Sequence, residues 1–399
     1  MFNTLKPAPP DPILGLTEAW REDPNPQKVN LGVGVYKDDG GRTPVLEAVK
    51  AAEAALLAAE TTKTYLPIAG DPDFRRRVQA FVFEGPAETA GPRAVTLQTP
   101  GGTGALRVGA EFVRFAAPDA RVWLSAPTWP NHAGVFSAAG MEASAYPWYD
   151  AAAHRLDTAE MLAALRAVPA GDVVVLHACC HNPSGADPAP EQWLEIAAAA
   201  ADAGWLPFLD AAYLGFARGL VQDRAATEAF AAAGVPFLQA TSFSKNLALY
   251  GERVGALTFV GPDEGTAATA LSQLQRIVRV LYSNPPIHGA AVAARVLGDR
   301  LLRARWEEEL TAMRERIHAV RGELVDGLAA RGVPGDFSFL RTQQGMFSFS
   351  GLSDEAVARL RTEKAIYIVK GGRINVAGLT RGNLDYVCDS IAEVLGAPG

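Results

Sequence analysis

"VPFLQATSFSKNLALYGERVG", residues 235–255, joins a continuous apolar run to a single lysine, Lys245. The run is short and follows a glycine, which is typical of a strand buried on both faces of a sheet. A lysine is rarely buried without a partner, because removing an unpaired charge from water is costly. Ser242 and Ser244 come just before Lys245, and Arg253 follows eight residues later. The stretch therefore predicts both a buried strand and a functional site at its end.

Other apolar runs of similar length are bounded by Gly, Pro or Asp and separated by alanine-rich stretches with helical spacing. They are AVTLQTP (94–100), RVWLSAP (121–127), GDVVVLHACC (171–180), GWLPFLD (204–210) and GALTFV (255–260). Buried strands that alternate with helices predict an α/β fold with a mainly parallel sheet. Ligands bind at the carboxyl ends of the strands in such sheets, so the residues just past each run are site candidates.

Length and composition limit the classes of protein to consider. A chain of 399 residues is expected to form one large domain and a smaller one. The net charge of −7 and the lack of a basic run argue against nucleic acid as a partner. The three cysteines, Cys179, Cys180 and Cys388, are expected to be small buried side chains rather than a disulfide framework. With no secretory signal and no window of membrane-span length, we expect a cytoplasmic protein with no membrane partner.

The ends of the chain differ in pattern from its middle. The proline-rich start predicts an extended arm over residues 1–14. A long amphipathic helix after about residue 300 and short strand-like pieces beyond it predict a smaller α+β domain, which the strand-like "VNLGVGVY" can join. We expect this small domain to comprise residues 15–44 and 311–399, and the large domain to comprise residues 45–310.

The first two runs are followed by glycines and aromatic residues. Gly101, Gly102 and Thr103 open a predicted helix, whose amides would favour an anion, although a Gly-Gly turn alone is weak evidence. The spacing is not that of a P-loop or of a dinucleotide fingerprint. Trp129 and His132 follow the next run, either as core residues or with the Trp129 ring stacked on a planar ligand.

Polar residues follow the next two runs. Asn182 begins an Asn-Pro turn, and Asp210 and Tyr213 come at the end of GWLPFLD and just after it. A buried aspartate needs a cationic or hydrogen-bonding partner. His177 and His181 are four residues apart, but a strand-to-loop segment does not put that spacing on one face as a helix would, so no metal is predicted.

Together these residues describe one cofactor. Two hydroxyls and a guanidinium suit a phosphate monoester, and a partly desolvated lysine with a lowered pKa is a nucleophile toward an aldehyde. A phosphate, an aldehyde, a stacked ring and an aspartate for a ring nitrogen describe pyridoxal phosphate. Asp210 would keep the pyridine nitrogen protonated, and Tyr213 and Asn182 could hydrogen-bond the ring hydroxyl.

Eight motifs then support a resemblance to a family. They are TPGGTGALR, PTWPNH, HNPSG, FLDAAYLGF, SFSKNLALYGERVG, YSNPP, GMFSFSGL and GGRINVAGL. In this order, and over nearly the whole chain, they resemble the class I aminotransferases, above all the bacterial aspartate and aromatic amino acid aminotransferases. The resemblance implies a fold type I pyridoxal-phosphate-dependent transferase, with a mostly parallel seven-stranded sheet in the large domain and a smaller α+β domain. It also implies a homodimer with shared active sites.

The resemblance further assigns roles. Lys245 would bind the cofactor covalently and act in catalysis with Asp210 and Tyr213. The implied cofactor-binding residues are Gly101, Gly102, Thr103, Trp129, His132, Asn182, Asp210, Tyr213, Ser242, Ser244, Lys245, Arg253 and, across the dimer interface, Tyr65. The implied substrate-binding residues are Gly34, Trp129, Asn182, Arg279 and Arg373.

Arg373 would clamp the substrate α-carboxylate, which the Gly34 backbone also approaches, and Arg279 would reach a side-chain carboxylate across the interface. Leu214, Ser184 and Gly101 depart from the family pattern, and Gly101 removes one phosphate hydroxyl.

The implied reaction is ping-pong transamination, in which Lys245 moves a proton from the substrate Cα and 2-oxoglutarate accepts the amino group. Val35, Lys37, Thr43 and Asn284 resemble the aspartate-type members, whereas YPWYDAA and NPSGAD are closer to the aromatic type. We therefore expect aspartate as a substrate, with phenylalanine and tyrosine as further candidates. The alternatives are an aromatic aminotransferase with aspartate as a secondary substrate, and a β-lyase or decarboxylase, which the two substrate arginines argue against. A non-catalytic regulator would need a fused DNA-binding domain, and a scaffold would be colourless.

Overall fold

The structure is a computed structural model that describes residues 2–7 and 13–397. The chain divides into a larger unit, Pro44–Glu315, and a smaller unit formed by Met1–Thr43 and Arg316–Gly399. The long helix α11 (Arg300–Ala330) has residues in both units. Part of the arm predicted over residues 1–14, at positions 1 and 8–12, lies outside the described residues.

The larger unit contains a seven-stranded sheet. Its strands, in order across the sheet, are β2 (Ala94–Pro100), β10 (Val254–Val260), β9 (Phe237–Ser242), β8 (Leu206–Ala211), β7 (Val173–His177), β3 (Val122–Ala126) and β4 (Ala143–Pro147). The strands from β9 to β4 pair in parallel, and β10 is antiparallel to both of its neighbours. The prediction of an α/β fold with a mostly parallel sheet is confirmed.

The sequence pattern of each strand follows from its burial. In β7, β9 and β10 every residue is buried, so these strands are mostly apolar and six apolar runs could be recognised in the sequence. The seventh strand, β4, lies at the edge of the sheet, and only one of its five residues is buried. An exposed edge strand does not need a continuous apolar run, which is why β4 could not be recognised in the sequence.

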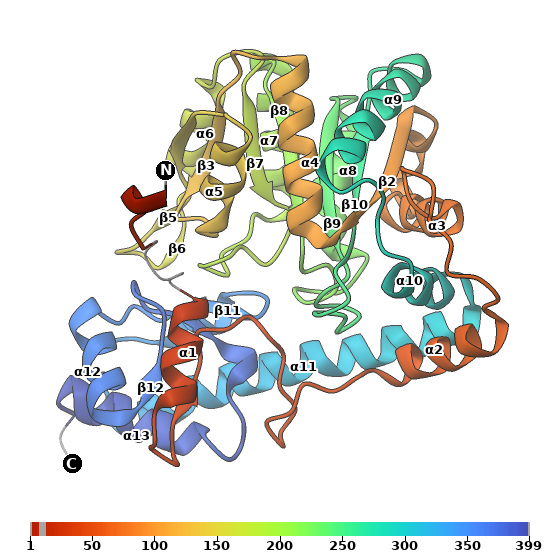
Figure 1. The fold of residues 1–399 in the computed structure, drawn as a ribbon. Helices are drawn as coiled ribbons and strands as arrows, with labels where there is room; N and C mark the ends of the chain where they lie inside the picture. The colour runs from red at the N-terminus through yellow and green to blue at the C-terminus, as the bar shows by residue number, and fades with distance from the viewer. Residues whose placement is uncertain (1, 8–12, 398–399) are drawn as a thin grey trace. The chain divides into compact units, whose positions relative to one another are not determined.

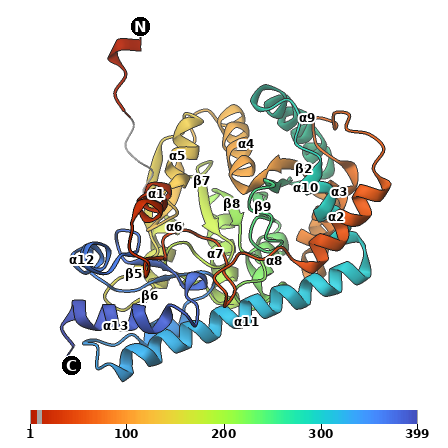
Figure 2. The ribbon, with the colours of Figure 1, turned by 60° about the horizontal axis from the view of Figure 1, so that its bottom comes forward.

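Helices cover the sheet. Those of the larger unit are α2 (Glu47–Ala59), α3 (Pro72–Val82), α4 (Gly101–Ala116), α5 (Asn131–Ala138), α6 (Thr158–Arg166), α7 (Pro190–Ala203), α8 (Ala225–Ala232), α9 (Glu264–Leu281), α10 (His288–Gly298) and the first part of α11. Figure 1 shows α4 in front of the central strands, and its contacts are with β10, β9, β2 and β8. Figure 2 shows α2, α3 and α10 grouped beside the edge strand β2.

The core between α4 and the sheet is tightly packed. Leu106 of α4, Leu274 of α9 and Phe208 of β8 are members of one buried cluster. α4 approaches the sheet so closely at Gly109 that a Cβ atom there would lie 2.4 Å from the Cζ atom of Phe208. A residue without a side chain therefore sets the distance between this helix and the sheet.

The antiparallel direction of β10 matters for the site. Because β10 runs opposite to β9, it begins at the edge where β9 ends, and Gly255 pairs with Ser242. The same strand pairs with β2 so that Val254 lies opposite Pro100. The residues just before β10 are thus brought to the edge of the sheet where β9 and β2 both end.

The smaller unit is built from short strands and helices. Its elements are α1 (Leu14–Glu22), the end of α11, α12 (Asp354–Lys364) and α13 (Leu384–Leu395), with the strand pairs β1 (Val29–Asn30) with β12 (Ile366–Tyr367) and β11 (Phe347–Phe349) with β13 (Arg373–Asn375). The start of "VNLGVGVY" is strand β1, which joins the C-terminal part of the chain, as the sequence allowed. Within the described residues, every helix is too short or too polar to span a bilayer.

Candidate active site

An anion cradle is formed at the sheet edge by residues from β9, β10 and α4. Arg253, which precedes β10, donates from Nη1 to the Ser244 hydroxyl at 3.2 Å. Gly101, the first residue of α4, has a φ of +73°, and a Cβ atom there would lie 2.4 Å from Nη2 of Arg253. Glycine therefore suits position 101, where φ is positive and the Arg253 guanidinium lies close.

The start of α4 completes this cradle. A Cβ atom at Gly102 would lie 3.1 Å from the Cβ atom of Ser242, so the first turn of the helix packs directly against the end of β9. Thr103 also belongs to that first turn. Free N–H groups at a helix N-terminus, two hydroxyls and a guanidinium are all groups that bind a phosphate. The sequence predicted each of these groups separately, and the structure brings them to one place.

Lys245 lies in the loop that follows β9 and is partly buried. Burial lowers the pKa of Lys245 to about 8; the Arg253 guanidinium acts in the same direction, and the Asp210 carboxylate opposes both. The Lys245 ammonium nitrogen lies 4.7 Å from the centre of the Tyr213 ring. A lysine with this pKa is partly neutral near neutral pH and can act as a nucleophile or a base.

Asp210 is buried near the end of β8 and is held by a histidine. His132 Nε2 lies 3.0 Å from Asp210 Oδ2, and His132 Nδ1 lies 2.8 Å from the Thr128 hydroxyl. If Thr128 donates to Nδ1, the ring proton is on Nε2 and is donated to Asp210. Burial by itself would raise the pKa of Asp210, but the His132 hydrogen bond and nearby cationic groups outweigh it and keep that pKa below its usual value. Asp210 is therefore a buried anion next to Lys245.

Two further histidines lie behind His132. The His177 ring is 5.0 Å from that of His132 and 4.4 Å from that of His181, between ring centres. Burial, together with the neighbouring imidazoles, lowers the pKa of His177 well below its usual value, so the ring is neutral. His181 stacks on Trp148, and its two ring nitrogens contact the hydroxyls of Ser125 and Ser184.

Thr128, Ser125 and Ser184 were not predicted as parts of this network. Each is a common residue in a loop or at a strand end, and only its place in the fold gives it a role.

Within the described residues, two clusters contain ligand types that suit a metal, namely His132, His177 and Asp210, and Cys179, Cys180 and Asp223. In the first, Asp210 already accepts a hydrogen bond from His132. In the second, the Asp223 carboxylate accepts three backbone N–H bonds, from Gly215, Ala217 and Arg218. Cys179, Cys180 and Cys388 are buried, and within the described residues none of them forms a disulfide bond, as expected. That no metal binds remains a prediction.

The other predicted cofactor residues of the larger unit lie in loops near these strand ends. Trp129 is partly buried, and its ring meets the His132 ring edge to face at 5.3 Å. Asn182 is buried, with a cis peptide bond to Pro183, and Tyr213 is buried in the loop after β8. Their proposed contacts with the cofactor ring remain predictions.

Tyr65 and Arg279 are exposed instead. The Tyr65 side chain is 87% exposed, and Arg279, at the end of α9, donates to the Ser283 hydroxyl at 2.5 Å. Their proposed roles across a subunit interface remain predictions.

In the smaller unit, Arg373 and Gly34 share one neighbour. Arg373 is buried in β13, donates to the carbonyl oxygen of Gly32, and lies over the Phe347 ring at 4.4 Å from its centre. A Cβ atom at Gly34 would lie 2.6 Å from the Cζ atom of Phe347. The two predicted carboxylate-binding positions thus both adjoin the Phe347 ring within this unit.

Comparison with known proteins adds independent information. The family model "Aminotransferase class I and II" matches residues 26–391. An aspartate aminotransferase of Escherichia coli K12 is 51% identical over 396 residues, which cover 99% of this chain and 100% of the relative.

Two solved structures are also similar over their whole length. An aromatic amino acid aminotransferase from Burkholderia pseudomallei, covalently bound to pyridoxal phosphate, has a TM-score of 0.95 and 48% identity, with 99% of each chain covered. A psychrophilic aromatic amino acid aminotransferase from Psychrobacter sp. B6, cocrystallised with aspartic acid, has a TM-score of 0.96 and 41% identity, with 99% of this chain and 100% of that chain covered.

Proposed function

Since the chain belongs to the class I and II aminotransferases, we propose that it transfers the amino group of aspartate to 2-oxoglutarate, with phenylalanine and tyrosine as further donors. It is an aminotransferase that uses pyridoxal 5′-phosphate. Aspartate is placed first because the aspartate aminotransferase of E. coli has the higher identity, 51% against 48% for the aromatic enzyme of B. pseudomallei. The aromatic donors are included because the similarity to that enzyme is nearly as great. The named relatives are all aminotransferases, so a β-lyase or decarboxylase is not proposed.

The observation that carries this proposal is the cluster at the carboxyl edge of the sheet. The cradle of Ser242, Ser244 and Arg253 fits the phosphate, and the buried anion Asp210 fits a protonated ring nitrogen. Lys245, with its lowered pKa, fits the aldehyde. When bound, pyridoxal phosphate supplies an electron-withdrawing ring that can accept the electrons of a broken Cα–H bond.

The residues of the chain have distinct tasks in this mechanism. Lys245 would remove the proton from the substrate Cα as a neutral amine and, as an ammonium, would deliver it to the former aldehyde carbon of the cofactor, so it acts as base and then acid. A pKa of about 8 suits both states near neutral pH. His132 keeps Asp210 ionised by donating a hydrogen bond to it. Arg373 binds the α-carboxylate with its planar fork and thereby orients the substrate.

The remaining cofactor and substrate residues follow the same proposal. Trp129 stacks on the ring, Asn182 and Tyr213 bind its hydroxyl group, and the amides of the first turn of α4 bind the phosphate. The larger unit is the cofactor domain, and the smaller unit carries the α-carboxylate site at Gly34 and Arg373. The three buried cysteines, which form no disulfide bond in the described part of the chain, suit a reducing cytoplasm, which is the proposed location.

The proposed assembly is a homodimer with shared active sites. Tyr65 is 87% exposed and Val280, next to Arg279, is 86% exposed, although large apolar side chains gain by being covered. In the dimer, Tyr65 of the partner subunit would contact the phosphate, and Arg279 of the partner subunit would bind the side-chain carboxylate of the substrate.

Hybrid dimers test the shared site. Lys245→Ala and Arg279→Ala variants are mixed, unfolded and refolded together. If Arg279 acts across the interface, each hybrid dimer keeps one intact site, and the mixture recovers about a quarter of wild-type activity. If Arg279 acts within its own subunit, neither site of the hybrid is intact and no activity returns.

An absorbance measurement tests the reaction itself. The purified protein is expected to show the absorbance of lysine-bound pyridoxal phosphate, and aspartate alone should convert it to that of pyridoxamine phosphate. Phenylalanine, added to a separate sample, ranks the two donor classes. A protein that shows the lysine-bound absorbance but responds to neither amino acid would refute the proposed function.

A further inference from the structure

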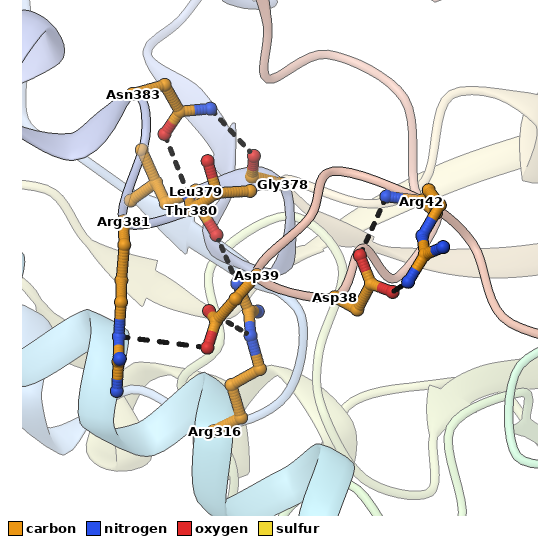
Figure 3. Close-up of polar contacts among 9 residues, drawn as sticks. All are labelled: Asp38, Asp39, Arg42, Arg316, Gly378, Leu379, Thr380, Arg381 and Asn383. Carbon is orange, nitrogen blue, oxygen red and sulfur yellow. Dashed lines mark hydrogen bonds and ion pairs between the residues drawn. The ribbon is translucent and has the colours of Figure 1, made fainter.

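Arg316, on α11, joins two stretches of the smaller unit (Figure 3). Its Nε donates to Asp39 Oδ1 at 2.9 Å, and its Nη2 donates to the carbonyl oxygen of Leu379 at 2.8 Å. The guanidinium also lies 5.5 Å from the centre of the buried Tyr36 ring. Only 14% of the Arg316 side chain is exposed, whereas the Asp39 side chain is 48% exposed.

The first stretch is the glycine segment, residues 32–43, which contains Gly34. Its first half is attached to the chain after β13. Asn375 donates from Nδ2 to the carbonyl oxygens of Val33 and Val35, at 2.7 and 2.8 Å, and the Lys37 amide donates to the carbonyl oxygen of Ala377. These bonds attach the first half of the segment, on either side of Gly34, to the chain after β13.

The second half of the glycine segment depends on side chains. Asp38 closes its own turn by accepting from the Arg42 amide and side chain, as the right-hand part of Figure 3 shows. Asp39 points instead toward Arg316. Arg316 therefore holds this half through a charge-assisted hydrogen bond to Asp39 and through its position over the Tyr36 ring.

The second stretch follows β13, the strand of Arg373. The 3-10 helix Val376–Gly378 comes directly after β13 and leads to Leu379. Asn383 closes the next turn, since its Oδ1 accepts from the Thr380 amide and its Nδ2 donates to the Gly378 carbonyl oxygen. By binding the Leu379 carbonyl oxygen, Arg316 ties this turn to the glycine segment.

We propose that Arg316 is a positioning residue for the substrate α-carboxylate, which it serves by fixing the glycine segment relative to β13. The inference rests on the proposed function, in which Gly34 and Arg373 bind that carboxylate. Both already contact the Phe347 ring, so a small shift of the glycine segment changes the distance between them. A misplaced carboxylate site weakens substrate binding, whereas the cradle and Lys245, in the other unit, are left intact.

The chain offers a matched control in Arg381. Arg381 also pairs with Asp39, at 3.7 Å, but its side chain is 82% exposed. Figure 3 shows the two arginines on different sides of the Asp39 carboxylate. An exposed ion pair contributes little, so loss of Arg381 should leave the glycine segment in place.

The experiment compares Arg316→Gln, Arg316→Lys and Arg381→Gln with the wild-type holoenzyme. Single-turnover reactions with aspartate give the apparent substrate affinity and the limiting rate separately. For Arg316→Gln we expect about tenfold weaker affinity, or about 1.4 kcal/mol, with a limiting rate and a cofactor absorbance like those of the wild type. Arg316→Lys should recover part of the affinity, because lysine keeps the charge but not the planar fork. Arg381→Gln should match the wild type.

A purely structural role would lower the melting temperature without changing affinity, so an Arg316→Gln holoenzyme with wild-type affinity overturns the inference. An equal loss of affinity in Arg381→Gln also overturns it. If Arg316→Gln does not fold, Asp39→Asn is the second variant, because it removes the ion pair but keeps the side-chain shape. It is expected to weaken the affinity for aspartate. Wild-type affinity in Asp39→Asn refutes the proposal. A wild-type protein that does not respond to any amino acid refutes the proposed function instead.

Discussion

Lys245 should be unusually acidic when the cofactor is removed. Burial lowers its pKa from 10.5 to about 8. At pH 7.5, about a quarter of Lys245 would then be neutral, against about 0.1% for a lysine with the ordinary pKa, a difference of roughly 200-fold in reactive amine. The experiment therefore varies the pH of the cofactor-free protein across the range between these two pKa values.

The assay is the labelling rate of Lys245 by a small amine-directed reagent, followed by mass spectrometry. The rate should rise with a midpoint near pH 8, with the exposed Lys370 labelled in the same sample as an internal reference. Two substitutions should move the midpoint in opposite directions. Arg253→Gln removes a cation that lowers the Lys245 pKa, so the midpoint should rise, and Asp210→Asn removes an anion that raises it, so the midpoint should fall. A wild-type midpoint near pH 10, or shifts of the same sign in both variants, would refute the electrostatic reasoning.

The same pKa makes a prediction about stability. The folded cofactor-free protein binds fewer protons at Lys245 than the unfolded chain does between pH 8 and 10.5. Its stability should therefore fall as the pH is lowered from 10.5 through 8, by about 3 kcal/mol from this group. Urea unfolding at pH 8 and pH 10 measures this, and Lys245→Met should remove that part of the pH dependence.

Two other substitutions test the packing around the site. His132→Phe should weaken pyridoxal phosphate binding about tenfold or more, because Asp210 loses the hydrogen bond that keeps it ionised. Equilibrium titration of the cofactor-free protein with pyridoxal phosphate measures this. Unchanged affinity would contradict the role of His132. Gly109→Ala should lower the free energy of unfolding by about 1–3 kcal/mol, because the new Cβ would clash with Phe208. Gly91→Ala, where a Cβ atom would meet no other atom within 4 Å, is the control in thermal unfolding, and equal effects of the two substitutions would contradict the packing argument.

The fold could be predicted largely because its central strands are buried on both faces. Such strands are mostly apolar, and that leaves a clear pattern in a single sequence. The apolar pattern does not reveal the direction of a strand in the sheet, however, since "GALTFV" would be equally apolar in a parallel or an antiparallel strand. The antiparallel pairing of β10 follows from the topology of the sheet, and the edge strand β4 needed no apolar run at all.

The candidate site was predictable for a different reason. Its residues follow successive strands, and the carboxyl ends of those strands meet at one edge, so Ser242, Asp210 and Gly101 could be grouped before any coordinates were known. Arg316 could not be found in this way. It lies in a helix rich in arginine and glutamate, where the shielded guanidinium groups of Arg316 and Arg321 have the same local pattern as those of exposed arginines.

The order of strands in the sheet also determines when the anion cradle can form during synthesis. β2 is the first strand of this sheet to leave the ribosome and β10 is the last, yet the two are neighbours in the sheet. Gly101, just after β2, and Arg253, just before β10, can therefore form the anion cradle only once β10 has been synthesised and paired with β2. Pairing between such distant segments is slow and leaves apolar surface exposed in the meantime. Capture of the cofactor can thus occur only after the sheet has closed, and its binding energy stabilises finished chains rather than partly folded ones.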